Sequence, residues 1–171
     1  MNLTTIRSDA EIIQQHFIDS AMGDRLLPPD CDALADIGSG AGLPGLPLKI
    51  LRPSLRLLLV ESAKRKASFL HFLSGSLGLR DIEIRTERAE RLARDPKVRH
   101  QFAAVTARAL ARPEAAARLA APFCRPGGRI LLYVTAVAHP VWPPELVPSA
   151  QQDYRLPGLA HPRRVVALAP R

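Results

Sequence analysis

A glycine-rich segment after the first short apolar run has the strongest potential for ligand chemistry in this sequence. It extends from Asp36 to Gly45 and reads DIGSGAGLPG. Glycine adopts backbone conformations that other residues avoid, and it leaves space where a Cβ atom would collide with a ligand. A turn of this kind between a strand and a helix is typical of nucleotide-binding loops. We therefore expect a nucleotide-like ligand beside Asp36, Gly38, Gly40 and Gly42.

Two classes of nucleotide cofactor fit this segment. Its second half, Gly40-x-Gly42-x-x-Gly45, matches the dinucleotide fingerprint of nicotinamide-dependent oxidoreductases, although another glycine precedes it and a proline interrupts it. Its first half begins at Asp36 and has the Asp-x-Gly-x-Gly-x-Gly pattern of S-adenosylmethionine-dependent methyltransferases, whose loop lies under the amino-acid part of the cofactor. A tight turn that binds nothing is the third interpretation.

Residues that follow the later apolar runs, most of them charged, complete the candidate site. Glu61 follows the second run, where a carboxylate can accept hydrogen bonds from both ribose hydroxyls of either cofactor or simply start a helix. Arg108 follows the fourth run, where a guanidinium can hold a cofactor carboxylate or an RNA phosphate, or remain a surface arginine. Ala89 and Glu90 follow the third run, where an adenine-binding edge or an exposed helix start is expected.

Apolar runs alternate with helical patterns along the chain and would position these residues. Short apolar runs predict strands, and amphipathic stretches predict helices. Ser8 and Glu11 form a candidate capping box for the first helix. The prolines between residues 136 and 150 predict a loop, and Gly127-Gly128 predicts a turn. The expected strands are 33–37, 57–60, 82–85, 102–106, 130–134 and 165–168, the last paired near Tyr154, and the expected helices are 8–22, 44–52, 63–77 and 113–123.

This alternation predicts an α/β fold with a mostly parallel sheet and helices on both of its faces. In such a sheet a ligand binds beyond the carboxyl ends of the strands, where the strand order reverses. The glycine segment and the charged residues above all follow strands. We expect one domain over residues 1–171, with an N-terminal helical segment at 1–30 and an α/β core at 31–171.

Composition narrows the function classes. The 171 residues carry a formal net charge of +8, which suits an acidic partner such as nucleic-acid phosphates or an anionic membrane surface, or else a basic solvated face. The longest apolar stretch, 130–138, is too short to span a bilayer, and the start lacks a secretory signal pattern. Cys31 and Cys124 have no metal-ligand spacing, and the histidines are scattered. We expect a cytoplasmic protein without a metal site.

Beyond single motifs, the sequence resembles the GidB family, also called RsmG. The likeness is strongest from residue 2 to residue 79, and its most specific part is the Gly-Leu-Pro-Gly-Leu-Pro extension of the glycine segment. Family members usually carry further helices ahead of the first shared motif, which here begins at Asn2. The matching stretches are NLTTIR at 2–7, HFIDS at 16–20, DIGSGAGLPGLPL at 36–48, ESAKRK at 61–66, RAE at 88–90 and RA at 108–109.

The resemblance implies a Rossmann-like class I methyltransferase fold and an S-adenosylmethionine-dependent enzyme that methylates guanine N7 in 16S ribosomal RNA. It implies cofactor contacts at Gly38, Leu43, Ala89, Glu90 and Arg108, with Glu61 as the ribose acceptor. It places Asn2, Arg7, His16 and Asp19 near the target base, where a structural role for the histidine is the alternative. Lys64, Arg65 and Lys66 would then face RNA phosphates, or else form a solvated helix face.

The implied chemistry needs little from the protein. Guanine N7 has a free lone pair at neutral pH, so its attack on a sulfonium methyl group requires positioning rather than a general base, and no catalytic dyad is predicted. The expected partner is 16S ribosomal RNA or the small ribosomal subunit, bound by a monomer without membrane contact. A non-catalytic RNA-binding assembly factor with a degenerate cofactor loop remains the alternative to an enzyme.

Overall fold

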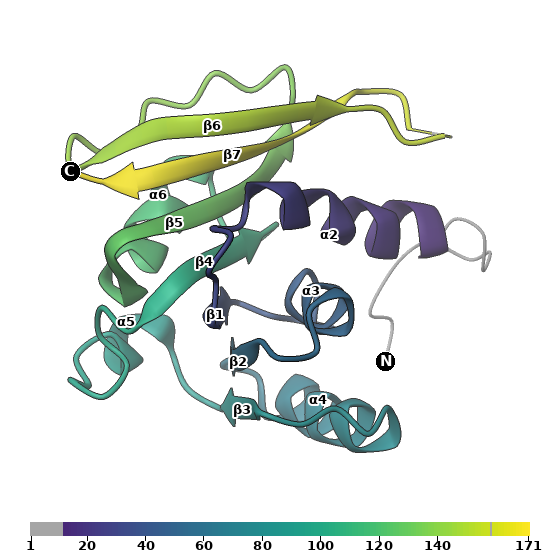
Figure 1. The fold of residues 1–171 in the computed structure, drawn as a ribbon. Helices are drawn as coiled ribbons and strands as arrows, with labels where there is room; N and C mark the ends of the chain where they lie inside the picture. The colour runs from purple at the N-terminus through teal and green to yellow at the C-terminus, as the bar shows by residue number, and fades with distance from the viewer. Residues whose placement is uncertain (1–11, 158) are drawn as a thin grey trace.

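The computed structural model describes residues 12–157 and 159–171, which form one seven-stranded sheet with helices on both faces (Figure 1). The expected capping box at Ser8 and Glu11 lies outside the described residues. The strands are β1 (Ala33–Ile37), β2 (Arg56–Val60), β3 (Ile82–Arg85), β4 (Phe102–Arg108), β5 (Cys124–Thr135), β6 (Leu146–Tyr154) and β7 (Arg163–Pro170). The helices are η1 (Ile13–Ile18), α2 (Asp19–Ala21), η2 (Met22–Leu26), α3 (Gly45–Leu51), α4 (Lys64–Ser76), α5 (Ala89–Leu92), α6 (Pro113–Ala120) and η3 (Ala121–Phe123).

The strand order is β3-β2-β1-β4-β5-β7-β6, so the predicted mostly parallel sheet is confirmed. Strands β1 to β5 run parallel to one another, whereas β7 is antiparallel to both of its neighbours, β5 and β6. The chain order reverses between β1 and β4, which places the end of β1 at the switch point where ligands bind in such sheets. The glycine segment begins there.

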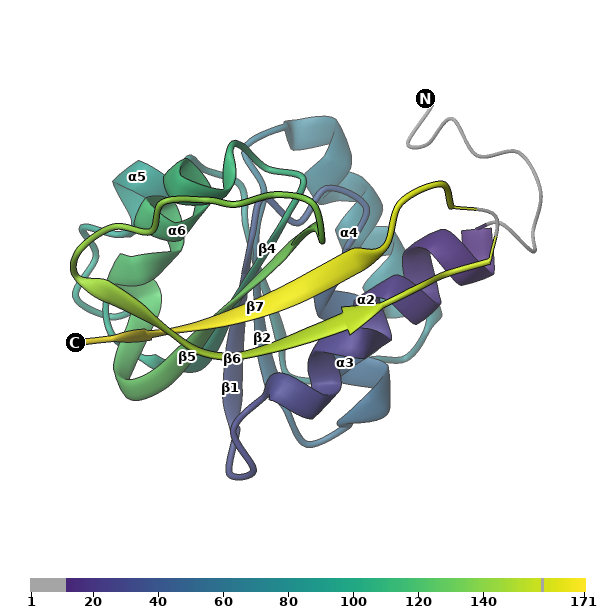
Figure 2. The ribbon, with the colours of Figure 1, turned by 90° about the horizontal axis from the view of Figure 1, so that it is seen from above.

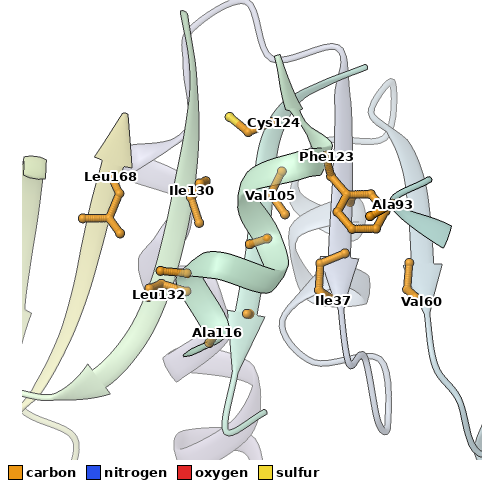
Figure 3. Packing of buried hydrophobic residues seen from close by; sticks show 14 of the residues in the cluster. Ile37, Val60, Ala93, Val105, Ala116, Phe123, Cys124, Ile130, Leu132 and Leu168 are labelled. Atoms are coloured by element: carbon orange, nitrogen blue, oxygen red, sulfur yellow. The ribbon is translucent and has the colours of Figure 1, made fainter. Parts of the chain in front are cut away.

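Two apolar layers hold the sheet between its helices. On one face, residues of α5 and α6 pack on the sheet around Phe123 and Ile37 (Figure 3). On the other face, Leu48 of α3 and Leu70 of α4 pack against β1 and β2. All five residues of β1 are buried, as expected for a central parallel strand covered on both sides. Burial of these side chains is the main stabilising term for the arrangement.

The predicted helices agree with the described structure where they can be compared. The expected helix at 63–77 is α4, and Gly78 ends it with a φ of +62°, a conformation that glycine adopts without strain. The expected helix at 113–123 is α6 followed by the 3-10 turn η3. The first helix changes its hydrogen-bond pattern from π at η1 through α2 to 3-10 at η2.

Two expectations about the C-terminal third are wrong. The loop predicted for 136–150 ends at residue 145, because β6 begins at Leu146 and contains Pro148. Proline is compatible with this strand because β6 is the last strand of the sheet and the pairing shifts register between Pro148 and Ala150. The predicted turn at Gly127-Gly128 lies instead inside β5, where the pairing with β4 is irregular. The predicted pairing of the last strand near Tyr154 is confirmed.

The N-terminal helical stretch lies across the C-terminal hairpin β6–β7 (Figure 2). The Tyr133 hydroxyl of β5 donates a 2.7 Å hydrogen bond to the carbonyl of Ser20. Gly23 allows this approach, because a Cβ atom at that position would collide with the Tyr133 hydroxyl. Among the residues that the structure describes, no helix combines the length and the apolar character needed to cross a membrane.

Candidate functional site

A pocket of about 440 Å³ lies beyond the carboxyl ends of the parallel strands, on the side of α5 and α6. A second pocket, of about 410 Å³, lies at the opposite edge beside Ala33 and Phe102, where strands begin. We assign the site by position, because ligands bind at the carboxyl ends in this class of sheet. The site pocket is lined by Ile37, Gly38, Val60, Glu61, Ser62, Lys66, Glu87, Arg88, Ala89, Glu90, Ala109, Leu110 and Leu119.

The glycine segment turns sharply because three of its residues have positive φ angles. These are +70° at Gly38, +57° at Gly40 and +88° at Gly42. A Cβ atom at Gly38 would collide with Leu110, and one at Gly42 would collide with Leu46. At Gly40 the nearest neighbour of such an atom would be the Gly38 carbonyl, at 3.8 Å. The first and third glycines therefore serve packing, whereas Gly40 leaves open space.

The loop is anchored to the neighbouring strand by its backbone. The amides of Gly38 and Ser39 both donate to the carbonyl of Val60, at 2.9 and 3.0 Å. The Ser39 hydroxyl donates to the carbonyl of Asp36 at 2.8 Å. Leu43, an expected cofactor contact, follows in the turn that leads into α3, and its amide donates to the carbonyl of Ser39. These bonds fix the backbone of the loop to the end of β2.

Asp36 supports the loop from inside the protein. Its carboxylate is fully buried and accepts hydrogen bonds from the Thr106 hydroxyl at 2.8 Å and the Gly45 amide at 3.1 Å. Burial raises the pKa of the Asp36 carboxyl to about 6, and the hydrogen bonds from Thr106 and Gly45 oppose this rise. The structure therefore places this expected cofactor residue beneath the loop, where it joins β1, β4 and α3.

Glu61 joins the loop to the start of α4. It is 6% exposed, and its two carboxylate oxygens accept hydrogen bonds from the amides of Gly40 at 3.0 Å and Ala63 at 2.8 Å. A carboxylate oxygen has more than one acceptor position, so these bonds leave capacity for a ribose hydroxyl. Because Glu61 also lines the pocket, its position agrees with the expected role.

The expected adenine-binding residues form another wall of the same pocket. Ala89 and Glu90 begin α5, and both line the pocket together with Arg88. Lys66 of α4, which the resemblance implies at RNA, also lines this pocket. Lys64 and Arg65 are exposed in the first turn of α4. All three basic residues are exposed, and of the three Lys66 also lines the pocket.

Arg108 ends β4 and points to the N-terminal helical stretch. Its Nη1 donates to Asp19 Oδ2 at 2.7 Å, and its Nη2 lies 2.8 Å from His16 Nδ1. Residues Ile37 and Ala107 are register partners, so Arg108 lies beside Gly38 at the mouth of the loop. The structure thus joins Arg108, expected at the cofactor, to His16 and Asp19, expected near the target base.

His16 and Asp19 are engaged by the protein. Nδ1 of His16 accepts a hydrogen bond from the Arg108 guanidinium, which has only donors, so this nitrogen carries no proton. Burial and the neighbouring Arg108 charge lower the pKa of His16. Asp19 is fully buried. The other two residues expected near the base, Asn2 and Arg7, lie outside the described residues.

Two further members of this cluster were not identified from the sequence. The Tyr154 hydroxyl donates to Asp19 Oδ1 at 2.6 Å, and Arg163 approaches both oxygens of Asp19 at 3.3 Å. The expected pairing of the last strand near Tyr154 is the one sequence feature that pointed to these two residues. Because β7 is antiparallel to β5, its first residues lie at the carboxyl ends of the parallel strands. In residues 12–157 and 159–171, no three His, Cys, Asp or Glu side chains group as metal ligands would.

Comparison with solved structures shows a methyltransferase fold. A geranyl diphosphate methyltransferase in complex with S-adenosylmethionine superimposes with a TM-score of 0.67 at 14% identity, covering 91% of this chain and 85% of that chain. A SAM-dependent methyltransferase from Aquifex aeolicus superimposes with a TM-score of 0.66 at 11% identity, covering 94% and 93% of the two chains. The expected class I fold is therefore confirmed.

Comparison of sequences identifies the family. The ribosomal RNA small subunit methyltransferase G of Roseiflexus sp. (strain RS-1) is 48% identical over 131 residues, which cover 77% of this chain and 56% of the relative. The chain thus spans about half the length of the curated relatives that it matches. The family model GidB, described as rRNA small subunit methyltransferase G, matches residues 1–140. With most of its length matched, and with the fold that such enzymes share, the chain belongs to the rRNA small subunit methyltransferase G family.

Proposed function

We propose that this protein binds S-adenosylmethionine in the pocket beside Gly38 and transfers its methyl group to N7 of a guanine in 16S ribosomal RNA. The observation that carries the proposal is the Glu61 carboxylate, which is fixed by the Gly40 amide and lines a pocket at the switch point of the sheet. Family membership favours this function over a nicotinamide-dependent oxidoreductase.

Residues that line the pocket, together with Gly40 and Arg108 beside it, fit this cofactor. Gly40 leaves open space where the loop would lie under the amino-acid part of the cofactor. Glu61 offers acceptors for the ribose hydroxyls, and Ala89 with Glu90 would border the adenine. Arg108 would hold the carboxylate of the cofactor through its guanidinium. The remaining expected contacts, Asp36, Gly38, Gly42 and Leu43, shape and support the loop.

The chain's contribution to the reaction is positioning. When bound, S-adenosylmethionine supplies an electrophilic methyl group on a sulfonium centre. Guanine N7 has a lone pair at neutral pH, so no side chain needs to remove a proton before attack. Holding the two reactants in line accounts for most of the catalysis that such a transfer requires. Glu61 and the glycine loop would fix the cofactor, and the RNA contacts would fix the base.

RNA binding would use the surface next to the pocket. Lys64 and Arg65 are exposed in the first turn of α4, and the chain carries a net charge of +8. Positive side chains bind RNA phosphates by releasing counterions, so the affinity should fall steeply with salt. An unpaired guanine in an RNA loop is the base that can reach the pocket. We propose that the protein acts as a monomer in the cytoplasm, on 16S ribosomal RNA or the small ribosomal subunit, without membrane contact.

The direct test is methyl transfer to RNA. Small ribosomal subunits, and separately naked 16S ribosomal RNA, are incubated with the protein and isotope-labelled S-adenosylmethionine, and digested RNA is analysed by mass spectrometry. We expect labelled 7-methylguanosine that depends on the protein. Cofactor binding without label in RNA would support the non-catalytic assembly factor instead. Calorimetry that detects binding of NADH but not of S-adenosylmethionine would support the oxidoreductase.

A further inference from the structure

Asp19 joins the N-terminal helical stretch to the C-terminal hairpin at the mouth of the glycine loop. It accepts hydrogen bonds from Arg108 of β4, from Tyr154 at the end of β6 and from Arg163 at the start of β7. The Asp19 side chain is 0% exposed, whereas Arg108 is 11% and Arg163 is 27% exposed. We call these four residues the Asp19 cluster. Its carboxylate is inaccessible, and its guanidiniums lie closer to the surface.

The Asp19 cluster carries a surplus of positive charge. Two guanidiniums, Arg108 and Arg163, share the one carboxylate of Asp19. His16 does not add to this positive charge, because its Nδ1 accepts a hydrogen bond from Arg108 and therefore carries no proton. The Tyr154 hydroxyl donates to Asp19, and burial together with the Asp19 carboxylate raises the pKa of Tyr154, so its hydroxyl keeps its proton. A partly buried surplus charge of this kind favours the binding of an anionic group.

The two halves of the cluster differ in their relation to the family. Arg108 and Asp19 lie within residues 1–140, which the family model matches, and both belong to motifs of the resemblance. Tyr154 and Arg163 lie beyond that match, in the hairpin β6–β7. The hairpin therefore brings a second guanidinium and a hydroxyl to a carboxylate that already pairs with the expected cofactor residue.

We propose that Arg163 is a positioning residue for the carboxylate of the cofactor, because it offsets the charge of Asp19 and so leaves Arg108 a net cation at the mouth of the glycine loop. Tyr154 assists by fixing the orientation of the Asp19 carboxylate. This inference rests on the proposed binding of S-adenosylmethionine. Arg108 touches the cofactor in this arrangement, whereas Arg163 acts through Asp19 and Arg108.

The argument follows from charge balance. Without Arg163, Asp19 and Arg108 would form a one-to-one pair with no surplus charge. A cofactor carboxylate would then compete with Asp19 for the Arg108 guanidinium and would be repelled by Asp19 at the same time. With Arg163 in place, Asp19 has a second cationic partner, which donates to both of its oxygens. Arg108 can then donate to an incoming carboxylate while Asp19 stays neutralised.

The test compares two ligands that differ in the methionyl tail. S-adenosylhomocysteine carries the carboxylate, and 5′-methylthioadenosine shares the adenosine and the thioether but lacks the tail. Calorimetry measures both affinities for the wild type and for Arg163→Gln, Arg163→Lys and Arg164→Gln. Arg164 is the matched control, because it is the next residue along β7 and pairs with the exposed Asp153 instead of Asp19. Replacing Arg164 changes the net charge of the protein by the same amount.

We expect Arg163→Gln to weaken S-adenosylhomocysteine binding about tenfold and to leave 5′-methylthioadenosine binding unchanged. Arg163→Lys should restore most of the loss, because lysine keeps the charge. Arg164→Gln should change neither affinity. Equal weakening of both ligands by Arg163→Gln would mean a merely structural role and would overturn the inference, as would unchanged binding of both. Weakened RNA association with unchanged binding of S-adenosylhomocysteine would also overturn it, in favour of an RNA phosphate as the anion.

A second variant keeps the inference testable if Arg163→Gln does not fold. Tyr154→Phe keeps the ring and removes the hydroxyl that Asp19 accepts, so it should weaken S-adenosylhomocysteine binding about threefold without affecting 5′-methylthioadenosine. Tyr133→Phe is its control, because the Tyr133 hydroxyl bonds to Ser20 on the same helical stretch. Equal effects of the two variants would overturn the inference. If the wild type binds neither ligand, the proposed function itself fails.

Discussion

The Glu61 carboxylate, which lines the candidate pocket, accepts a hydrogen bond from the backbone amide of Gly40 at 3.0 Å. The other oxygen of Glu61 accepts from the Ala63 amide. Both oxygens therefore serve as acceptors, and an amide side chain can replace only one of them. Glu61→Gln should weaken the binding of S-adenosylhomocysteine and of 5′-methylthioadenosine alike, by about tenfold or more, because both ligands carry the ribose. Calorimetry checks this, and a loss confined to S-adenosylhomocysteine would contradict the assignment of Glu61 to the ribose.

Gly40 should be required for the ligand rather than for packing. A Cβ atom there would meet no protein atom closer than 3.8 Å, so Gly40→Ala should destabilise the fold only by the strain of its +57° φ angle, about 1 kcal/mol. We expect S-adenosylhomocysteine affinity to fall about tenfold or more in Gly40→Ala. Gly40→Asp should abolish binding, because its charge would also repel the ligand carboxylate.

Gly78 provides the control for this substitution. It has a similar φ angle of +62°, has open space around its Cβ position and lies at the end of α4. Gly78→Ala should lower the free energy of unfolding by a similar amount and leave ligand affinity unchanged. Equal ligand affinities of the two alanine variants would show that Gly40 does not contact the cofactor.

Asp36 should make the protein less stable as the pH rises. Burial raises the pKa of its carboxyl from the ordinary 3.8 to about 6, so folding takes up a proton at pH values between these two. The contribution to the free energy of unfolding is largest below pH 4 and falls by about 3 kcal/mol as the pH rises through 6. Asn can keep one bond each to Gly45 and Thr106, so Asp36→Asn should remove this fall.

Urea denaturation at pH 4 and pH 7.5 measures the effect. The free energy of unfolding of Asp36→Asn, relative to that of the wild type, should be higher at pH 7.5 than at pH 4. Asp32→Asn is a control of opposite sign, because the hydrogen bond from Arg56 lowers the pKa of Asp32, a mostly exposed group. Its stability relative to the wild type should decline as the pH rises. Parallel pH profiles of Asp36→Asn and the wild type would rule out a buried, titrating Asp36.

RNA binding should depend on Lys64 and Arg65. The double variant Lys64→Glu, Arg65→Glu should bind RNA roughly tenfold more weakly at low salt and with a shallower salt dependence, because it reverses two cations. Its affinity for S-adenosylhomocysteine should not change, since neither residue lines the pocket. A matched control, Lys97→Glu with Arg99→Glu, reverses two exposed cations that precede β4 at the opposite edge of the sheet. Equal losses in both double variants would argue for diffuse attraction instead of a defined RNA surface.

The placement of several candidate residues at one edge of the sheet could be predicted because these residues follow the parallel strands. Glu61 and Ala89 follow β2 and β3, and the common direction of parallel strands brings their ends to one edge. The role of Asp36 could not be predicted, because the pattern does not reveal that Thr106 and the Gly45 amide occupy its carboxylate. Lys66 lines the pocket because of the face that α4 turns toward it. The spacing of residues along the helix does not determine which face that is.

The C-terminal third was harder to predict. Pro148 argued for a loop, but proline is compatible with a strand at the edge of a sheet. The contacts of Asp19 with Tyr154 and Arg163 join residues from the two ends of the chain. Such contacts depend on the antiparallel return of β7, whose direction was not apparent from its apolar pattern.

The contact between Gly23 and Tyr133 restricts which amino-acid substitutions this protein can accept during evolution. The aromatic hydroxyl occupies the volume that a side chain at position 23 would need, so neither position can be replaced freely on its own. A larger residue at 23 requires a smaller one at 133, and the two substitutions should occur together in descendants of this sequence. Combining Gly23→Ala with Tyr133→Leu should accordingly be tolerated better than Gly23→Ala alone.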